Sequence, residues 1–181
     1  ADMLNSNTFP YNVTLSDSWN KMYKLEFLCK SGVRFELPKG SNGTDTAFNW
    51  KIALCSPSYA TIEDENYTHV IYKSSAVHRK KKNLYGGFQI ITQQLIDLAR
   101  TRYPEGKYND AISYFYYRFL RMSLVDVARD SESYIDCRRD IKALLKRHMQ
   151  FISENNLHYG ISIQNSKDRE FRLILHILGY T

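Results

Sequence analysis

The sequence has few of the residues that interrupt or cross-link a chain, with 4 prolines, 8 glycines and 3 cysteines among 181 residues. Cys29, Cys55 and Cys137 lie far apart in none of the spacings that metal ligands use, and an odd number cannot all pair within one chain. A reducing compartment is therefore the simpler interpretation. No uninterrupted apolar run approaches the roughly 20 residues of a membrane span, so we do not expect an integral membrane protein.

The chain does contain an excess of positive charge and an ordinary share of apolar residues. Lys and Arg number 25 against 19 Asp and Glu, so the formal net charge is +6 and the pI is about 9.1. This charge favours contact with something acidic, and a nucleic acid, a membrane surface and a sugar nucleotide all qualify. With 43% apolar residues, the chain can bury one sizeable core.

The residue pattern changes near residue 83. Before it, short apolar stretches alternate with Gly, Pro, Ser and Asn, which predicts an irregular α/β region with short strands around residues 32–37, 60–62 and 68–72. Two short helices are expected there as well. One covers about residues 24–31 and ends at Gly32, and the other begins at Thr44 or Asp45 and continues until Pro57.

After residue 83 the apolar spacing is helical. Ile91, Leu95 and Leu98 repeat at helix spacing up to a stop at Pro104. Further helices are expected at about 109–129, 133–154 and 166–179, and they should fold back as a small bundle. The predicted fold class is therefore α/β in residues 1–82, followed by an α-helical region in residues 83–181.

Four segments in the first half carry a family resemblance through their order and spacing. They are SWNKMY at residues 18–23, FL at 27–28, GVRF at 32–35 and TDTAFN at 44–49. Together they resemble the second half of the GT-A type catalytic domain of bacterial family 2 glycosyltransferases. The match is specific over residues 18–78 and loose beyond them, where the tail FRLILHILGY at 171–180 is similar to the Leu-rich end of the family.

The resemblance implies that a sugar is transferred from a nucleotide-sugar donor to an acceptor hydroxyl, with inversion, in bacterial surface polysaccharide or glycan synthesis. Asp45 stands where the family places the general base, and Thr44 stands where the family has Glu. A base must lie within hydrogen-bond reach of the hydroxyl that it deprotonates. The alternative for Asp45 is a simple helix-capping residue.

Further binding roles follow from the same resemblance. Lys73, His78 and Arg79 are expected to bind the leaving diphosphate, whose charge needs a divalent metal or basic side chains. The alternative is a solvated basic linker. Trp19 and Lys21 are expected on the acceptor side, where an indole stacks on sugar rings. Their alternatives are core packing for Trp19 and an ion pair for Lys21.

The motifs of a donor-binding half are absent from the sequence. There is no Asp-x-Asp triplet, and Gly86 and Gly87 form an isolated pair rather than a phosphate-binding loop. We therefore expect the chain to be the C-terminal part of a glycosyltransferase that is inactive alone. A divalent metal, Mn or Mg, is expected in the intact enzyme, with its ligands mostly outside this chain. The expected location is cytoplasmic, with the protein peripheral at the inner face of the membrane.

The alternative function is a non-enzymatic basic helical module that binds nucleic acid or an anionic membrane surface. Positive charge combined with 14% aromatic residues suits backbone neutralisation and base stacking. The basic residues of the helical region are, however, spread over several helices and form no single groove on the sequence evidence. Nucleic acid is therefore not expected as a partner, whereas contact of the basic helices with anionic lipid is compatible with a glycosyltransferase.

Overall fold

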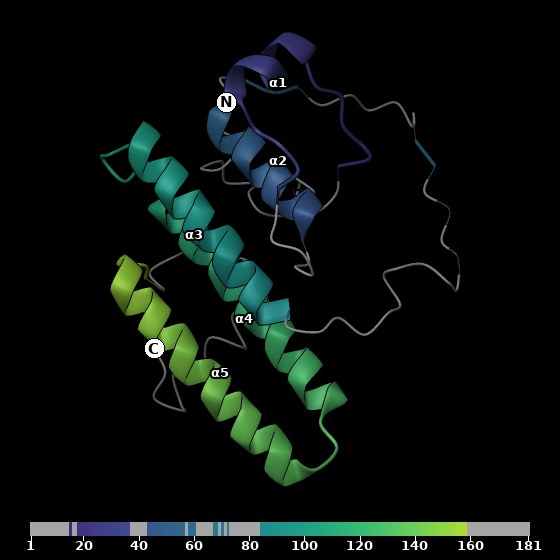
Figure 1. The fold of residues 1–181 in the computed structure, drawn as a ribbon, viewed down its shortest axis with the longest axis vertical. Helices are drawn as coiled ribbons and strands as arrows, with labels where there is room; N and C mark the ends of the chain where they lie inside the picture. The colour runs from purple at the N-terminus through teal and green to yellow at the C-terminus, as the bar shows by residue number, and fades with distance from the viewer. Residues whose placement is uncertain are drawn as a thin grey trace. The chain divides into compact units, whose positions relative to one another are not determined.

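The structure is a computed structural model that describes residues 15, 18–36, 43–56, 58–60, 67–68, 70, 72 and 84–158. The regular structure of these residues consists of five α-helices (Figure 1). The chain divides into two compact units, residues 1–98 and 99–181. Unit 1 contains α1 (Leu25–Ser31), α2 (Thr44–Cys55) and most of α3 (Leu84–Arg102), and unit 2 contains α4 (Asn109–Asp130) and α5 (Tyr134–Asn155).

The α/β architecture predicted for the first half is wrong for the residues that the structure describes, because these contain no strand. Val33, Phe35, Thr68, Val70 and Tyr72 are all non-helical, and none of them is paired in a ladder. Their side chains suit a pleated, half-buried surface, but a strand also needs a neighbouring strand to complete its hydrogen bonds. No described segment supplies that partner. In the two later predicted strands, Ala60 is also described, whereas residues 61–62, 69 and 71 lie outside the described residues.

The short helices of unit 1 confirm the predicted positions. α1 ends at Gly32, whose φ of 68° is left-handed and is accessible to glycine without a Cβ clash. α2 follows Gly43, which has a φ of 90°. A Cβ atom at Gly43 would lie 3.0 Å from Ile91 Cδ1 and 3.1 Å from Phe88 Cε1 of α3. Glycine therefore allows the start of α2 to lie close against α3.

One apolar cluster of unit 1 forms where α1, α2 and the segment after α1 meet. Val33, Phe48 and Ile52 are its buried centre. The partly buried side chains packed against it are Tyr23, Phe27, Leu28 and Cys55. Beyond its first turn α2 is largely buried, so this helix is anchored by its whole middle and C-terminal part.

The helical spacing predicted for α3 is confirmed, because Ile91 and Leu95 have no exposed surface. The helix ends at Arg102, two residues before Pro104. A residue that precedes proline is disfavoured in helical conformation, so the stop has a local cause.

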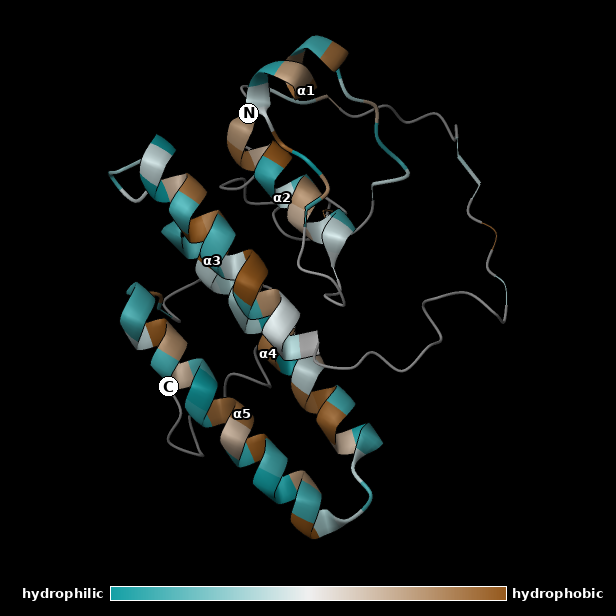
Figure 2. Ribbon diagram, in the orientation of Figure 1, coloured by the Kyte–Doolittle hydropathy of each residue, from teal (hydrophilic) through white to brown (hydrophobic). Residues whose placement is uncertain are grey.

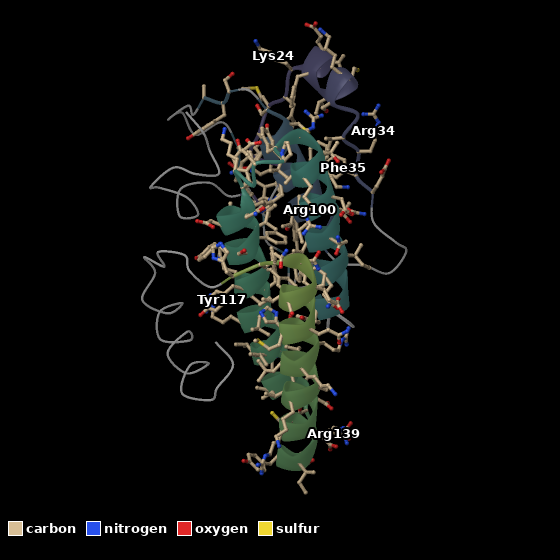
Figure 3. The ribbon with its side chains drawn as sticks, turned by 90° about the vertical axis from the view of Figure 1, so that its left-hand side faces the viewer. Lys24, Arg34, Phe35, Arg100, Tyr117 and Arg139 are labelled. Carbon is tan, nitrogen blue, oxygen red and sulfur yellow. The ribbon has the colours of Figure 1, made fainter. Side chains whose placement is uncertain are left out.

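In unit 2, α4 and α5 pack side by side (Figures 1 and 3). The Tyr116 ring lies between two α5 rings, 4.5 Å from His148 and 4.5 Å from Phe151. Hydropathy alternates along α5, as the brown and teal bands in Figure 2 show. The predicted bounds of both helices agree with the structure to within about a residue. The helix expected at 166–179 lies outside the described residues.

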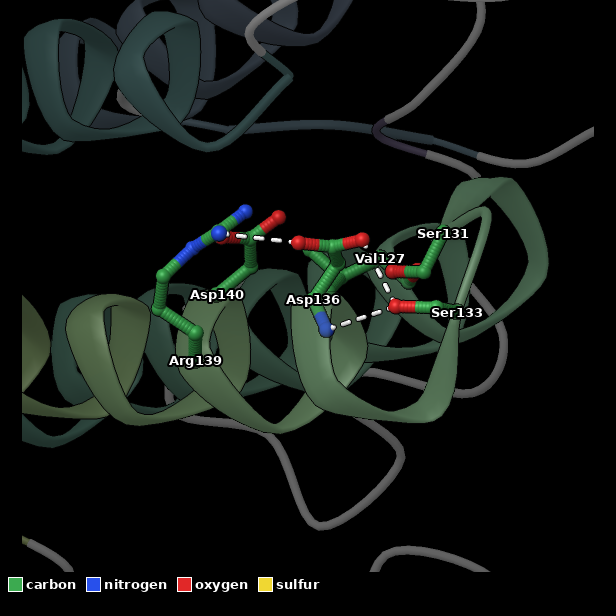
Figure 4. A network of polar contacts seen from close by, with 6 residues as sticks. All are labelled: Val127, Ser131, Ser133, Asp136, Arg139 and Asp140. Carbon is green, nitrogen blue, oxygen red and sulfur yellow. Dashed lines mark hydrogen bonds and ion pairs between the residues drawn. The ribbon is translucent and has the colours of Figure 1, made fainter.

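Polar contacts fix the connection between α4 and α5 (Figure 4). The Ser133 hydroxyl accepts a hydrogen bond from the Asp136 amide at 3.1 Å and donates one to Asp136 Oδ2 at 2.6 Å. Arg139 then pairs with Asp136 at 2.8 Å and with Asp140 at 3.0 Å. The pKa of Asp136 is lowered, first by the Ser133 hydrogen bond and then by the charge of Arg139. On the α4 side, the Ser131 hydroxyl donates to the Val127 carbonyl at 2.6 Å.

Candidate active site

Asp45 lies in the first turn of α2 and is exposed. The N-cap of the helix is Gly43, so Asp45 is not the N-cap residue. No described residue makes a hydrogen bond or an ion pair with the Asp45 carboxylate. The partial positive charge at the N-terminus of a helix favours a negative charge at this position. The site is therefore an open carboxylate on a helix whose remaining turns are held in the core.

Tyr23 and Asn49 lie beside this carboxylate. The Tyr23 hydroxyl donates a hydrogen bond to Asn49 Oδ1 at 2.7 Å, and its ring meets Phe48 edge to face at 5.5 Å and 82°. Burial raises the pKa of Tyr23 to about 12, and the negative charge of Asp45 adds to the increase. Tyr23 therefore keeps its proton at neutral pH and does not place a second negative charge next to Asp45.

The side-chain amide of Asn49 makes only some of the hydrogen bonds that it could make with the described residues. The residue is 1% exposed, its oxygen accepts from Tyr23, and its Nδ2 atom has no hydrogen-bond partner. It follows Asp45 by four residues, so both side chains lie on one side of α2. A buried donor without a partner is costly, and such groups are few in native proteins, so each of them calls for an explanation.

Unit 1 also has two stacked pairs of aromatic rings that are partly exposed. Phe35 stacks on Phe48 with centroids 3.8 Å apart and planes at 12°, although Phe35 itself is 53% exposed. Trp19 is 38% exposed and stacks on Tyr67 at 4.9 Å and 23°. Unit 1 thus presents exposed ring faces of the kind that pack against the apolar faces of sugars.

The structure does not bring the two predicted acceptor residues onto Asp45. Neither Trp19 nor Lys21 forms a hydrogen bond or ion pair with its carboxylate. Lys21 is half-buried, and its ammonium donates to Asn20 Oδ1 at 2.7 Å. Other charged residues of this unit, such as Lys24 and Arg34, point outward into solvent (Figure 3).

The predicted diphosphate-binding residues, Lys73, His78 and Arg79, lie outside the described residues. Within the described part of the chain, no group of three or more His, Cys, Asp or Glu side chains could hold a metal ion. Among the same residues, no helix combines the length and apolar character that a membrane crossing requires.

Tyr23 and Asn49 were not predicted as site residues. Each of them is nevertheless the last residue of a segment that carries the resemblance, Tyr23 of SWNKMY and Asn49 of TDTAFN. Asn49 has a local signal, because a polar residue four positions after Asp45 on an otherwise apolar helix lies on the same face. Tyr23 has none, since its contact with Asn49 joins residues 26 positions apart.

No protein-family profile, curated protein or solved structure matches this chain. The case for a function therefore rests on the residues around Asp45 and on the order of the sequence segments that carry them.

Proposed function

We propose that this chain is the acceptor-binding part of an inverting glycosyltransferase of the family 2 type. Such an enzyme transfers a sugar from a nucleotide-sugar donor to a hydroxyl group of a glycan or lipid-linked acceptor, here in bacterial surface polysaccharide or glycan synthesis. The observation that supports the proposal is the exposed Asp45 carboxylate on the first turn of an otherwise buried helix. Its position within the TDTAFN segment is the position of the base in the family that the sequence resembles.

In the proposed reaction Asp45 is the general base. The acceptor hydroxyl donates a hydrogen bond to the carboxylate, which takes the proton as the hydroxyl oxygen bonds to the anomeric carbon. The bond from that carbon to the donor phosphate oxygen breaks, and its electron pair leaves with the nucleoside diphosphate. Because attack comes from the side opposite the leaving group, the anomeric configuration inverts. A base fixed on a packed helix needs little reorganisation to reach this geometry.

Neighbouring side chains would hold the acceptor. Tyr23 remains neutral beside Asp45, and its hydroxyl oxygen can still accept a hydrogen bond from a sugar hydroxyl. The stacked rings of Trp19 and Tyr67 supply a surface for the sugar ring. Lys21 would meet a hydroxyl or phosphate group of the acceptor.

The donor side would be completed by basic residues and by a part of the protein beyond this chain. Lys73, His78 and Arg79 would neutralise the charge that develops on the leaving diphosphate. As the family resemblance implies, the ligands of a divalent ion, Mn or Mg, would lie mostly in the donor-binding half. Such an ion would supply further neutralisation of the diphosphate. A nucleotide-sugar donor favours a cytoplasmic location.

The test is Asp45→Asn in the longest natural form of the protein that includes a donor-binding half. The change keeps the size of the side chain and removes the base, so turnover should fall by roughly 10²-fold or more while donor binding stays near normal. The assay follows the nucleoside diphosphate that is released in the presence of acceptor.

Asp97→Asn is the matched control, because Asp97 is an exposed carboxylate of the same unit on α3. The hydrogen bond that Asp97 accepts from Gln93 can still form when Asp97 is replaced by Asn. The turnover of this variant should equal that of the natural protein. Unchanged turnover in Asp45→Asn would rule out Asp45 as the base.

A further inference from the structure

Three cations follow one another along the exposed side of α5. Arg138, Lys142 and Lys146 are spaced by four residues, so they form a single row with a small drift around the helix. All three are exposed, and none makes a hydrogen bond or an ion pair within the described part of the chain. The basic residues are scattered along the sequence, but the helix brings these three into one row.

Two other arginines of unit 2, Arg129 and Arg139, pair with neighbouring carboxylates. Arg129 pairs with Asp126 at 2.8 Å and with Asp130 at 2.9 Å. Arg139, whose side chain points outward from α5 in Figure 3, pairs with both Asp136 and Asp140. Asp126, Asp130, Asp136 and Asp140 are thus engaged by Arg129 and Arg139, whereas the exposed Glu132 makes no ion pair with the described residues. No carboxylate of the described residues pairs with Arg138, Lys142 or Lys146.

Exposed apolar side chains lie at the N-terminal end of the same row. Tyr134, one turn before Arg138, is 78% exposed, and Ile135 is 77% exposed. In the described part of unit 2, the other large apolar side chains that are exposed are Met122 and Val125, in the C-terminal half of α4. Such side chains cost free energy in water, and they gather around the connection between α4 and α5.

We propose that this surface, which we call the basic ridge (Tyr134, Ile135, Arg138, Lys142 and Lys146), docks unit 2 onto an anionic lipid surface. Cations next to exposed tyrosine and aliphatic side chains suit the boundary between lipid headgroups and acyl chains. The headgroups attract the three cations, and Tyr134 and Ile135 enter the boundary. The inference is independent of the proposed transfer reaction.

Lipid fits the ridge better than nucleic acid does. Proteins that bind single-stranded nucleic acid combine a positively charged groove with aromatic faces on which the bases stack. Tyr114, Tyr116 and Tyr117 of α4 are 3%, 1% and 1% exposed, so their faces are closed to bases. Tyr134 alone remains on the ridge.

The test measures co-sedimentation of the full chain with vesicles of phosphatidylcholine alone or with about one third phosphatidylserine. Binding is expected with the anionic vesicles only. It should disappear at about 1 M salt, where the screening length is roughly 3 Å. Lys142→Gln combined with Lys146→Gln should weaken it by roughly 25-fold, since each cation near an anionic membrane contributes about fivefold.

Lys24→Gln combined with Lys30→Gln is the matched control. It removes the same charge from exposed positions at α1 and should bind as the natural chain does. Ile135→Gln leaves the charge unchanged and should weaken binding by roughly tenfold, because a buried aliphatic side chain contributes at least that much. Circular dichroism establishes that each variant keeps its helices.

Three results would overturn the proposal. The first is equal binding to neutral and anionic vesicles, and the second is an equal loss in the ridge and control variants. The third is binding to a single-stranded oligonucleotide without binding to anionic vesicles, which would favour nucleic acid as the partner.

Discussion

His148 is a titratable side chain sealed inside unit 2. Its ring has no exposed surface and stacks on Tyr116 with planes at 14°. Burial lowers the pKa of His148 to about 3, because an imidazolium ion would lose its hydration there. The folded protein therefore holds the neutral ring over the whole physiological range.

This burial should make the stability of the protein depend on pH. The unfolded chain protonates His148 below about pH 6.5, whereas the folded protein does so only near pH 3. Between these values the unfolded state binds more protons, so the free energy of unfolding should fall by about 1.4 kcal/mol for each unit of acidification. His148→Phe keeps a ring against Tyr116 and should remove this part of the slope.

Urea unfolding of both proteins between about pH 7 and about pH 4 measures the difference in slope. The comparison cancels the carboxylates that titrate in the same range, since both proteins share them. A lower stability of the variant at neutral pH would leave the prediction intact. Parallel curves for the two proteins would contradict it.

How far single residues can be predicted depends on whether their environment is local. His148 follows Leu144 by four residues, so helical spacing alone puts both on one side of the helix, and the structure buries both. The exposed position of Asp45 at the start of α2 also follows from nearby residues. The bond between Tyr23 and Asn49, in contrast, depends on how α2 packs against the segment before α1, and no local pattern encodes that contact.

At the scale of elements, helices were predictable and strands were not, for a physical reason. A helix satisfies its hydrogen bonds within a few residues, so apolar spacing and end signals such as Gly32 and Pro104 define it. A strand satisfies its hydrogen bonds with another segment that the local sequence does not specify. Val33 and Phe35 therefore have strand-like side chains, yet they pack on α2 without a strand.

The cap of α5 gives a prediction at this scale. Ser133→Ala removes the oxygen that accepts from the Asp136 amide and should lower the free energy of unfolding by about 1 kcal/mol. Ser153→Ala is the control, because Ser153 is an exposed serine of the same helix away from the cap. Urea denaturation followed by circular dichroism measures both. An equal loss in the two variants would mean that the Ser133 hydrogen bond adds nothing.

For the whole molecule, the net charge of +6 is less informative than where the cations lie. On α5, Arg139 is neutralised by its neighbours, whereas Lys142 and Lys146 face solvent without a carboxylate partner. Charge that is already paired contributes little to attraction at a distance. The position of each charge also matters for the basic residues between 73 and 82. The proposed function assigns diphosphate binding to Lys73, His78 and Arg79 and not to the other basic residues of this segment.

If Lys73, His78 and Arg79 contact the leaving diphosphate, replacing each of them by Ala should weaken nucleoside diphosphate binding or lower turnover. Lys81→Ala and Lys82→Ala should have almost no effect, because solvated charges beyond contact distance are screened within about 8 to 10 Å at physiological salt. Calorimetric titration of UDP or GDP into each variant of the form with the donor-binding half measures the difference. The present chain alone should bind these nucleotides weakly or not at all, since the proposed function places the nucleotide pocket elsewhere. Equal small losses at all five positions would mean that the segment only raises the local positive potential, and diphosphate binding would then have to be assigned to other residues.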